Sequence, residues 1–271
     1  MPEGTTRPEN VSRIDRHGGG MEETRDLWEA WSEDFQGAWE AETDDDELPP
    51  APVHYGPGFP EDERLELLPD LANADVVELG CGGGQASVGF AREGVGRVVG
   101  VDFSSEQLDY ARRLRDVYDA EASFLVGDVS DLPLADEAFD LAFSSWVFQM
   151  VEDLQAAFAE AARVLRPDGA FVVTIPHPFS EIYDPEAREV ERSYFDPRPE
   201  RKSIGDIEAD MVVFHRTVGE IHRALTESGF VVEGLLEPGT DDPESYREQL
   251  SHKPDLMALV PPTLVVRATP A

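Results

Sequence analysis

The stretch VVELGCGGGQA, residues 76–86, joins an apolar, strand-like run to a turn built almost entirely from glycine. Four glycines fall within residues 80–84. A strand, a glycine-rich turn and a helix in this order let a ligand lie against backbone N–H groups at the helix N-terminus. A glycine turn alone is a weak signal, since tight packing of a strand on a helix needs the same residues.

The segments around this turn alternate between strand-like and helix-like patterns. The predicted strands cover residues 75–79, 97–101, 122–126, 139–144, 170–175, 230–236 and 263–268, and the predicted helices cover residues 84–92, 105–117, 151–165 and 217–228. Such alternation is typical of a parallel sheet with helices on both faces. The sequence therefore predicts an α/β fold with a doubly wound, mostly parallel sheet of seven strands.

An acidic residue at the end of the next strand points to a nucleoside ligand. Asp102 lies 22 positions beyond Gly80, where a carboxylate can accept hydrogen bonds from ribose hydroxyls. A solvated Asp at a strand end is the alternative. The dinucleotide fingerprint G-x-G-x-x-G/A is not matched, because Gln85 stands where it needs Gly or Ala. Glu78 suits a ligand with an ammonium and a sulfonium better than a pyrophosphate, although it could also cap nearby amides.

Four segments resemble, in order, successive motifs of class I S-adenosylmethionine-dependent methyltransferases: VVELGCGGGQ, VVGVDFSSEQLDYAR, FLVGDVSDLPLADEAFDLAFSS and ARVLRPDGAFVVTIP. The flanks VHYGPGF and FHRTVGEIHRALTESGFVVEGLLEP resemble those of small-molecule members of that superfamily. The similarity runs from about residue 50 to residue 267 and is specific because the motifs keep their order and spacing. It implies a Rossmann-like fold, S-adenosyl-L-methionine as the cofactor and a small-molecule methyl acceptor.

The resemblance also implies a set of cofactor-binding residues, namely Tyr55, Glu78, Gly80, Gly82, Gly84, Asp102, Phe103, Asp128, Val129 and Ser144. The three glycines would hold the methionine part of the cofactor, with Glu78 supporting it. Asp102 would bind the ribose hydroxyls, and Phe103 would pack beside the adenine.

The remaining members of this set have alternatives in ordinary structure. Asp128 would accept from the adenine amino group, although a turn residue in a Gly-Asp pair is the alternative. The amide of Val129 would meet the ring, and Ser144 would line the methionine and substrate side. Tyr55 would close over the cofactor, with ordinary packing of a turn as the alternative.

Methyl transfer from a sulfonium is an in-line displacement that mainly needs alignment and exclusion of water. No metal is expected, since no His/Cys/Asp set has credible metal spacing. His177, just beyond the fifth strand, is the candidate general base for an OH or amine acceptor; an exposed loop histidine between two prolines is the alternative. Cys81 is not expected to act as a nucleophile, because no partner base is evident.

Aromatic residues of two segments are expected to form the acceptor pocket. They are Trp28, Trp31 and Phe35 in an amphipathic helix predicted over residues 22–42, and Phe179, Tyr183, Tyr194 and Phe195 in a Pro- and Tyr-containing excursion. A hydrophobic core under a lid, or an oligomer contact, fits these residues equally well.

The predicted organisation is a disordered leader over residues 1–20 and one methyltransferase domain over residues 21–271. The domain divides into an N-terminal helical or lid segment (21–70), a cofactor-binding core (71–176), an acceptor-side insertion (177–212) and a C-terminal part of the sheet (213–271). The sequence leaves open whether Met21 is the true start and which oligomeric state the chain adopts.

Composition excludes some partners. The chain has 57 acidic and 22 basic residues, a net charge of -35, so nucleic acid is not expected to bind. The acidic excess is spread along the chain, which favours a salt-adapted source over docking to a basic partner. The chain has one cysteine and no apolar run of the roughly 20 residues that span a bilayer, so we expect a cytoplasmic protein without membrane contact.

Two other functions remain open. A nicotinamide-dependent oxidoreductase is disfavoured by Gln85 and by the lack of a Tyr-x-x-x-Lys pair. A cofactor-binding protein without catalysis is not excluded by any feature of the sequence.

Overall fold

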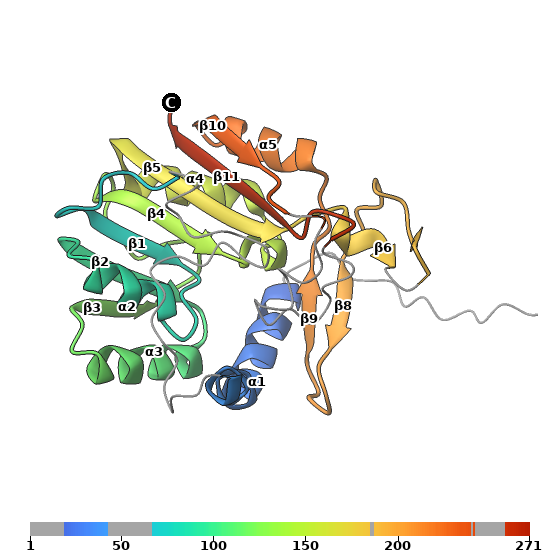
Figure 1. Cartoon of the computed structure of the whole chain (residues 1–271), viewed down its shortest axis with the longest axis horizontal. Coiled ribbons are helices and arrows are strands. Elements are labelled where there is room, and N and C mark those ends of the chain that lie inside the picture. Colours follow the sequence, from blue (N-terminus) through green and yellow to red (C-terminus); the bar gives the residue numbers. More distant parts are fainter. Residues whose placement is uncertain (1–18, 43–66, 185–186, 240, 242–257) are drawn as a thin grey trace, which may run out of the picture.

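The computed structural model describes residues 19–42, 67–184, 187–239, 241 and 258–271 (Figure 1). Within them, seven strands form one sheet in the order β10-β11-β5-β4-β1-β2-β3. The strands are β1 (Asp75–Leu79), β2 (Arg97–Asp102), β3 (Ala122–Val126), β4 (Phe139–Ser145), β5 (Leu165–Pro176), β10 (Phe230–Leu236) and β11 (Thr263–Pro270). The α-helices are α1 (Gly19–Glu42), α2 (Gln85–Arg92), α3 (Ser105–Val117), α4 (Leu154–Val164) and α5 (Val218–Glu227).

The pairing of the strands confirms the predicted α/β fold. The pairs β5–β4, β4–β1, β1–β2 and β2–β3 are parallel, and β11 pairs antiparallel with both β5 and β10. The chain leaves β1 toward β2 on one side and returns to pair β4 on the other. Ligands of open α/β sheets bind at such a switch point, outside the carboxyl ends of the strands.

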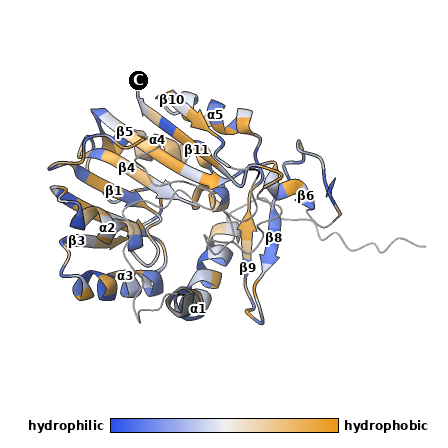
Figure 2. Cartoon of the chain, in the orientation of Figure 1, coloured by the Kyte–Doolittle hydropathy of each residue, from blue (hydrophilic) through white to orange (hydrophobic). Residues whose placement is uncertain are grey.

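Helices cover both faces of the sheet. Neighbouring residues of β1 enter different hydrophobic clusters, because successive side chains of a strand point to opposite faces. Val76 packs into the cluster under α2 and α3, and Val77 packs into the cluster under α4 and α5. Figure 2 shows the strongly hydrophobic ribbon concentrated in the central strands, between helices of mixed character. The glycine turn thus begins from a strand that is buried on both faces.

The excursion after β5 forms small antiparallel pairs beside the sheet. They are β6 (Tyr183–Asp184) with β7 (Glu189–Val190), and β8 (Glu200–Ser203) with β9 (Asp210–Val213). Helix α1 packs against α3 and β9, as Figure 1 shows. The backbone N–H of Val212 donates to Thr24 Oγ1 over 3.1 Å. This places the N-terminal helix between the sheet domain and the insertion.

Some predicted boundaries differ from the structure. Helix α1 begins at Gly19, so Gly19 and Gly20 are helical instead of belonging to a leader; residues 1–18 lie outside the described residues. Helix α4 begins three residues later than predicted, at Leu154, because Asp153 Oδ1 accepts from the N–H of Ala156 and caps it.

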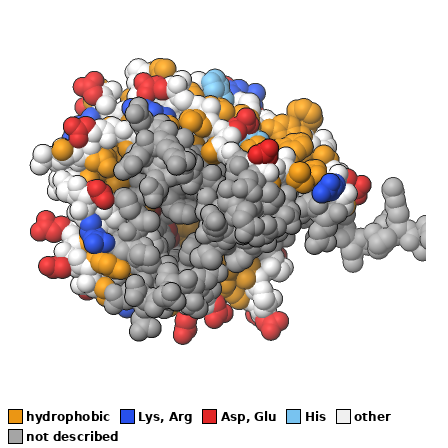
Figure 3. Space-filling view, viewed as in Figure 1, with side chains coloured by type: hydrophobic (Ala, Val, Ile, Leu, Met, Phe, Trp, Pro, Cys, Tyr) orange, Lys and Arg blue, Asp and Glu red, His pale blue; other side chains and the backbone are white. Residues whose placement is uncertain are grey.

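The surface of the described residues carries many acidic side chains, as the composition implies. In Figure 3, acidic side chains are scattered around the displayed face among apolar and basic ones, without gathering in one patch. Within the described ranges, no helix combines the length and the hydropathy that crossing a membrane requires.

Candidate functional site

The glycine turn folds back onto the end of β2. Gly80, Gly82 and Gly84 have φ values of +73°, +48° and +82°, in the left-handed region that glycine adopts without steric cost. The N–H groups of Gly80 and Cys81 both donate to the carbonyl of Val101, over 2.7 and 3.0 Å. The three glycines predicted from the sequence therefore stand where the backbone requires glycine.

Close contacts with neighbouring side chains explain the need for glycine at two of these positions as well as the approach of a ligand does. A Cβ on Gly80 would lie 2.3 Å from Val147 Cγ2, and a Cβ on Gly84 would lie 2.7 Å from the Cβ of Ala111. At Gly82 the first atom met, Gln107 Oε1, is 3.6 Å away. Close packing is thus part of the reason for Gly80 and Gly84, while Gly82 faces more open space.

Asp102 ties the glycine turn to the following helix. Its side chain is buried, with 7% of the residue exposed. Oδ2 accepts from the N–H of Gly82 over 2.8 Å, and Oδ1 accepts from the N–H of Ser104 over 2.9 Å. Burial raises the pKa of Asp102, although these backbone N–H groups oppose the rise. Each carboxylate oxygen keeps a further lone pair that could accept from a hydroxyl.

Glu78 lies in β1, two residues before Gly80, and is 5% exposed. The hydroxyl of Ser87, in the first turn of α2, donates to Glu78 Oε2 over 2.5 Å. Burial raises the pKa of Glu78 to about 8, the charge of Asp102 adds to the rise, and the hydrogen bonds of Ser87 oppose it. A buried carboxyl of this kind is stabilised as a carboxylate when a cation approaches.

Two further residues from the sequence analysis, Ser144 and Cys81, have structural roles around the switch point. Ser144 Oγ donates to the carbonyl of Leu79 over 2.7 Å and so fixes the end of β4 to the end of β1. Burial raises the pKa of the Cys81 thiol well above its usual range, which keeps it protonated and a weak nucleophile.

A cavity of about 310 Å³ lies at the adenine side of the predicted site. It is lined by Phe103, Val126, Gly127 and Asp128 and, from α1, by Met21, Glu22 and Arg25. This volume is in the range of small-molecule sites. Phe103 and Asp128 thus line one cavity, to which α1 also contributes, a contribution that was not predicted. Asp128 Oδ1 also accepts from the N–H of Ser130 over 2.8 Å, so it is a turn residue too.

Val129 is not among the described residues that line this cavity. Val129 is buried in the hydrophobic cluster under α4 and α5, so only its backbone is positioned to meet a ligand. Tyr55 lies outside the described residues.

A chain of buried hydrogen bonds joins α1 to the glycine turn. Gln85 Nε2 donates to Gln36 Oε1 over 3.1 Å, and Gln36 Nε2 donates to Gln107 Oε1 over 2.7 Å. Gln107 Nε2 donates in turn to Ser32 Oγ over 3.0 Å. The Gln36 amide also fills the space over Gly83, where a Cβ would lie 2.5 Å from Gln36 Nε2. We call Ser32, Gln36, Gln85 and Gln107 the glutamine clasp; it holds α1 against the turn.

His177 is held by hydrogen bonds at both ring nitrogens. Nδ1 accepts from the N–H of Phe179 over 3.1 Å, so the proton of the neutral ring lies on Nε2, which is 2.8 Å from Glu237 Oε1. The residue is 4% exposed, so the alternative of an exposed loop histidine is wrong. Burial lowers the pKa of His177, although Glu237 opposes this. Its role as a base stays a prediction, and neither nitrogen is free to take a proton in this arrangement.

The aromatic residues expected around an acceptor form separate local groups. Trp28 and Phe35 have ring centroids 5.1 Å apart, and Trp28 Nε1 lies 3.4 Å from Met150 Sδ, in the 3₁₀-helix η2 (Phe148–Met150) that follows β4. In the insertion, Phe179 stacks on Tyr183 at 6.0 Å. The α1 group therefore reaches the carboxyl end of β4. Among the side chains that the structure places, no His/Cys/Asp/Glu group is suited to hold a metal ion.

Comparison with known proteins agrees with this geometry. Residues 77–173 match the family described as "Methyltransferase domain". A 37.1 kDa protein in a Streptomyces fradiae transposon is 38% identical over 172 residues, 62% of this chain and 46% of that protein. The malonyl-[acyl-carrier protein] O-methyltransferase of Pectobacterium atrosepticum is 34% identical over 120 residues, 44% of this chain and 46% of that enzyme.

A solved structure of an S-adenosylmethionine-dependent methyltransferase from Mesorhizobium loti superposes with a TM-score of 0.57 and 27% identity, over 76% of this chain and 94% of that one. The present chain spans about half the length of the curated relatives it matches. The matched segment begins inside β1 and ends inside β5, so it contains the glycine turn and Asp102. Residues 77–173 are thus similar to a methyltransferase domain, and the comparisons imply S-adenosyl-L-methionine as its cofactor.

Proposed function

We propose that this protein transfers the methyl group of S-adenosyl-L-methionine to a small-molecule acceptor. The observation that carries the proposal is the pair of buried carboxyl groups, Glu78 in β1 and Asp102 at the end of β2, beside a glycine turn at the sheet's switch point. A nucleoside with a cationic tail needs a ribose acceptor and a carboxylate at these two places.

Different residues bind the adenosine part and the methionine part of the cofactor. Asp102 accepts from the ribose hydroxyls, and Phe103 and Asp128 hold the adenine in the 310 Å³ cavity. Glu78 and the backbone of Gly82 meet the methionine part, while Ser144 keeps the ends of β4 and β1 together. Tyr55 and the amide of Val129 complete the proposed set.

When bound, S-adenosyl-L-methionine supplies a methyl group on a sulfonium leaving group, so the protein's main tasks are alignment and exclusion of water. Helix α1 serves the second task, since the glutamine clasp fixes it over the turn. Its aromatic group, which reaches Met150 after β4, lies on the acceptor side of the same sheet edge.

A small acceptor is favoured by this enclosure and by the aromatic groups that suit a flat or apolar molecule. The net charge of -35 opposes nucleic acid as the acceptor. We further propose that the acidic excess is an adaptation to concentrated salt, because salt screens the repulsion that it creates. Binding is therefore best measured in potassium chloride of molar order.

The cofactor assignment predicts that S-adenosyl-L-methionine binds with release of a proton. Glu78 is mostly protonated in the free protein below its pKa of about 8, and a neighbouring ammonium or sulfonium favours the carboxylate. Calorimetry at neutral pH, in buffers of different ionisation enthalpy, measures the released proton. We expect the affinity to increase as pH rises toward 8, and NADH to bind weakly or not at all.

Glu78→Gln should abolish both the proton release and the pH dependence, whereas Glu93→Gln, at an exposed position after α2, should keep both. The same linkage affects stability: the contribution of protonated Glu78 is complete below the ordinary pKa of 4.5 and is lost as pH rises through about 8. Tighter binding of NADH than of S-adenosyl-L-methionine would contradict the assignment, as would proton release that persists in Glu78→Gln.

A further inference from the structure

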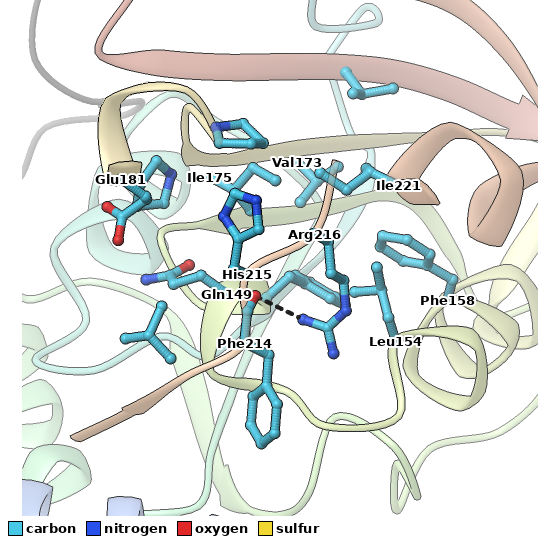
Figure 4. A pocket seen from close by; sticks show the side chains of 15 residues that line it. Gln149, Leu154, Phe158, Val173, Ile175, Glu181, Phe214, His215, Arg216 and Ile221 are labelled. Atoms are coloured by element: carbon cyan, nitrogen blue, oxygen red, sulfur yellow. Dashed lines mark hydrogen bonds between the residues drawn. The ribbon is translucent and has the colours of Figure 1, made fainter. Parts of the chain in front are cut away.

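A second, smaller cavity lies at the carboxyl end of β5, beside η2 (Figure 4). Its volume is about 30 Å³, enough for one hydroxyl group or one water. Its walls are mostly apolar and include Phe148, Phe158 and Ile175. The polar side chains in its lining are Gln149, Glu181, His215 and Arg216. A polar group of an acceptor that enters here is therefore removed from bulk water.

His215 is one of the lining residues, and one of its ring nitrogens is buried without a hydrogen-bond partner among the described residues. The residue is 6% exposed, and Nε2 lies 2.8 Å from the carbonyl oxygen of Tyr194. Since a carbonyl only accepts, Nε2 carries the proton of the neutral ring and Nδ1 keeps its lone pair. Nδ1 has no hydrogen-bond partner among the residues that the structure describes. A buried acceptor of this kind calls for an explanation, and a ligand's hydroxyl group is one.

The turn after β4 adds a second acceptor and local strain. Gln149 Nε2 donates to the carbonyl of Trp146 over 2.6 Å, which leaves Gln149 Oε1 without a partner within the described part of the chain. Trp146 has a φ of +58°, a region that a bulky residue rarely adopts and that is often found at functional sites. Gln149 and His215 both line the cavity, as Figure 4 shows.

The backbone around His215 is fixed to this turn. The N–H of Phe214 donates to the carbonyl of Gln149 over 2.8 Å. Arg216 is half-buried and donates to the carbonyl of Glu152 over 2.7 Å; desolvation lowers its pKa to about 10. These contacts on both sides of His215 hold the ring at the cavity and connect it to the end of β4.

We propose that His215 is the proton acceptor for a hydroxyl group of the methyl acceptor, with Gln149 Oε1 as its neighbouring positioning group. This inference rests on the proposed methyl transfer. In the step, a lone pair of the acceptor oxygen forms the new bond to the methyl carbon. The carbon–sulfur bond breaks with its electron pair left on sulfur, and the hydroxyl proton moves to His215 Nδ1. The positive charge passes from the sulfonium to the imidazolium, so the total charge in the site is unchanged.

The proposed base is thus His215 and not His177, the candidate base from the sequence. Both nitrogens of His177 are engaged by Phe179 and Glu237. His215 has the same tautomer, but its buried Nδ1 has no hydrogen-bond partner among the described residues. If His215 is the base, a hydroxyl-bearing probe should change the resonances of His215. If His177 is the base, it should change those of His177.

The test uses phenol, which carries an O–H donor, and anisole, which has the same ring without it. Each is titrated into the full chain with ¹⁵N-labelled histidine, in the presence and absence of saturating S-adenosylhomocysteine. We expect phenol to shift the His215 Nδ1 resonance and to leave the His177 resonances in place, while anisole shifts neither. One hydrogen bond corresponds to roughly 2- to 10-fold tighter binding of phenol than of anisole.

Two histidine variants test whether His215 causes the preference for phenol over anisole. His215→Phe should lose the preference for phenol, and His222→Asn, at an exposed histidine of α5, should keep it. A shift at His177 instead of His215, an equal response to anisole, or no response in the wild type would overturn the proposal without touching the cofactor assignment. If the wild-type protein showed the phenol shift but did not bind S-adenosylhomocysteine, the methyltransferase function would instead be overturned, and with it the catalytic role of His215.

Discussion

Replacing Asp102 by alanine is expected to weaken the binding of S-adenosylhomocysteine at least about 100-fold, measured by calorimetry. The variant loses an acceptor for two ribose hydroxyls, each worth about 1.5 to 3 kcal/mol when the acceptor is charged. It also frees the N–H groups of Gly82 and Ser104, which Asp102 now holds over 2.8 and 2.9 Å. The glycine turn therefore loses its tie to β2 together with its ligand.

Two variants separate these contributions. Asp102→Asn keeps the size of the side chain and one acceptor oxygen, so it should bind between the wild type and the alanine variant. Asp109→Ala, at an exposed position of α3, removes the same charge from the protein and should bind like the wild type. Wild-type affinity in a folded Asp102→Ala variant would contradict the site.

Gly83→Ala is expected to detach α1 from the glycine turn. The added methyl group would lie 2.5 Å from Gln36 Nε2, so the Gln36 amide must leave its bonds to Gln85 and Gln107. Overpacking and the lost hydrogen bonds should lower the free energy of unfolding by about 1 to 3 kcal/mol. Hydrogen exchange should show the amides of α1 opening more often than in the wild type.

A double variant tests whether the effect passes through the clasp. Gly83→Ala combined with Gln36→Ala should be no less stable than Gln36→Ala alone, because the shorter side chain leaves room for the methyl group. Gly37→Ala is the matched control: among the described residues, and apart from its chain neighbours and the backbone of its own helix, no atom lies within 4 Å of the added methyl group. Helix α1 should therefore be unchanged or stabilised by about 0.5 to 1 kcal/mol. Strictly additive effects of Gly83→Ala and Gln36→Ala would show that the clasp does not couple them.

The core of the fold was predictable because its signals are local. Val76 and Val77 belong to a run buried on both faces, which only a central strand of a covered sheet requires. Gly80 and Gly84 have positive φ values that the backbone imposes. Asp102 follows from its place at the end of the next strand, where a parallel sheet gathers its ligands.

The missed features depend on contacts between distant segments. Gln36 and Gln107 are 71 positions apart, and no local pattern pairs them. The one signal in the sequence was the spacing of two polar residues, Ser32 and Gln36, which lie one helical turn apart on an aromatic-rich helix. His177 was favoured because it directly follows β5, but its hydrogen bond to Glu237 spans 60 positions. His215 carries no motif, and its available nitrogen becomes visible only when β9 and η2 are placed together.

The most direct test of the central claim follows formation of S-adenosylhomocysteine from methyl-labelled S-adenosyl-L-methionine, with the full chain in potassium chloride of molar order and a panel of small hydroxyl, amine, thiol and carboxylate acceptors. We expect that at least one acceptor accelerates this formation and that the label appears in the small-molecule fraction. This expectation would be contradicted if the protein bound S-adenosyl-L-methionine yet no acceptor raised the rate above background, or if added nucleic acid took up the label.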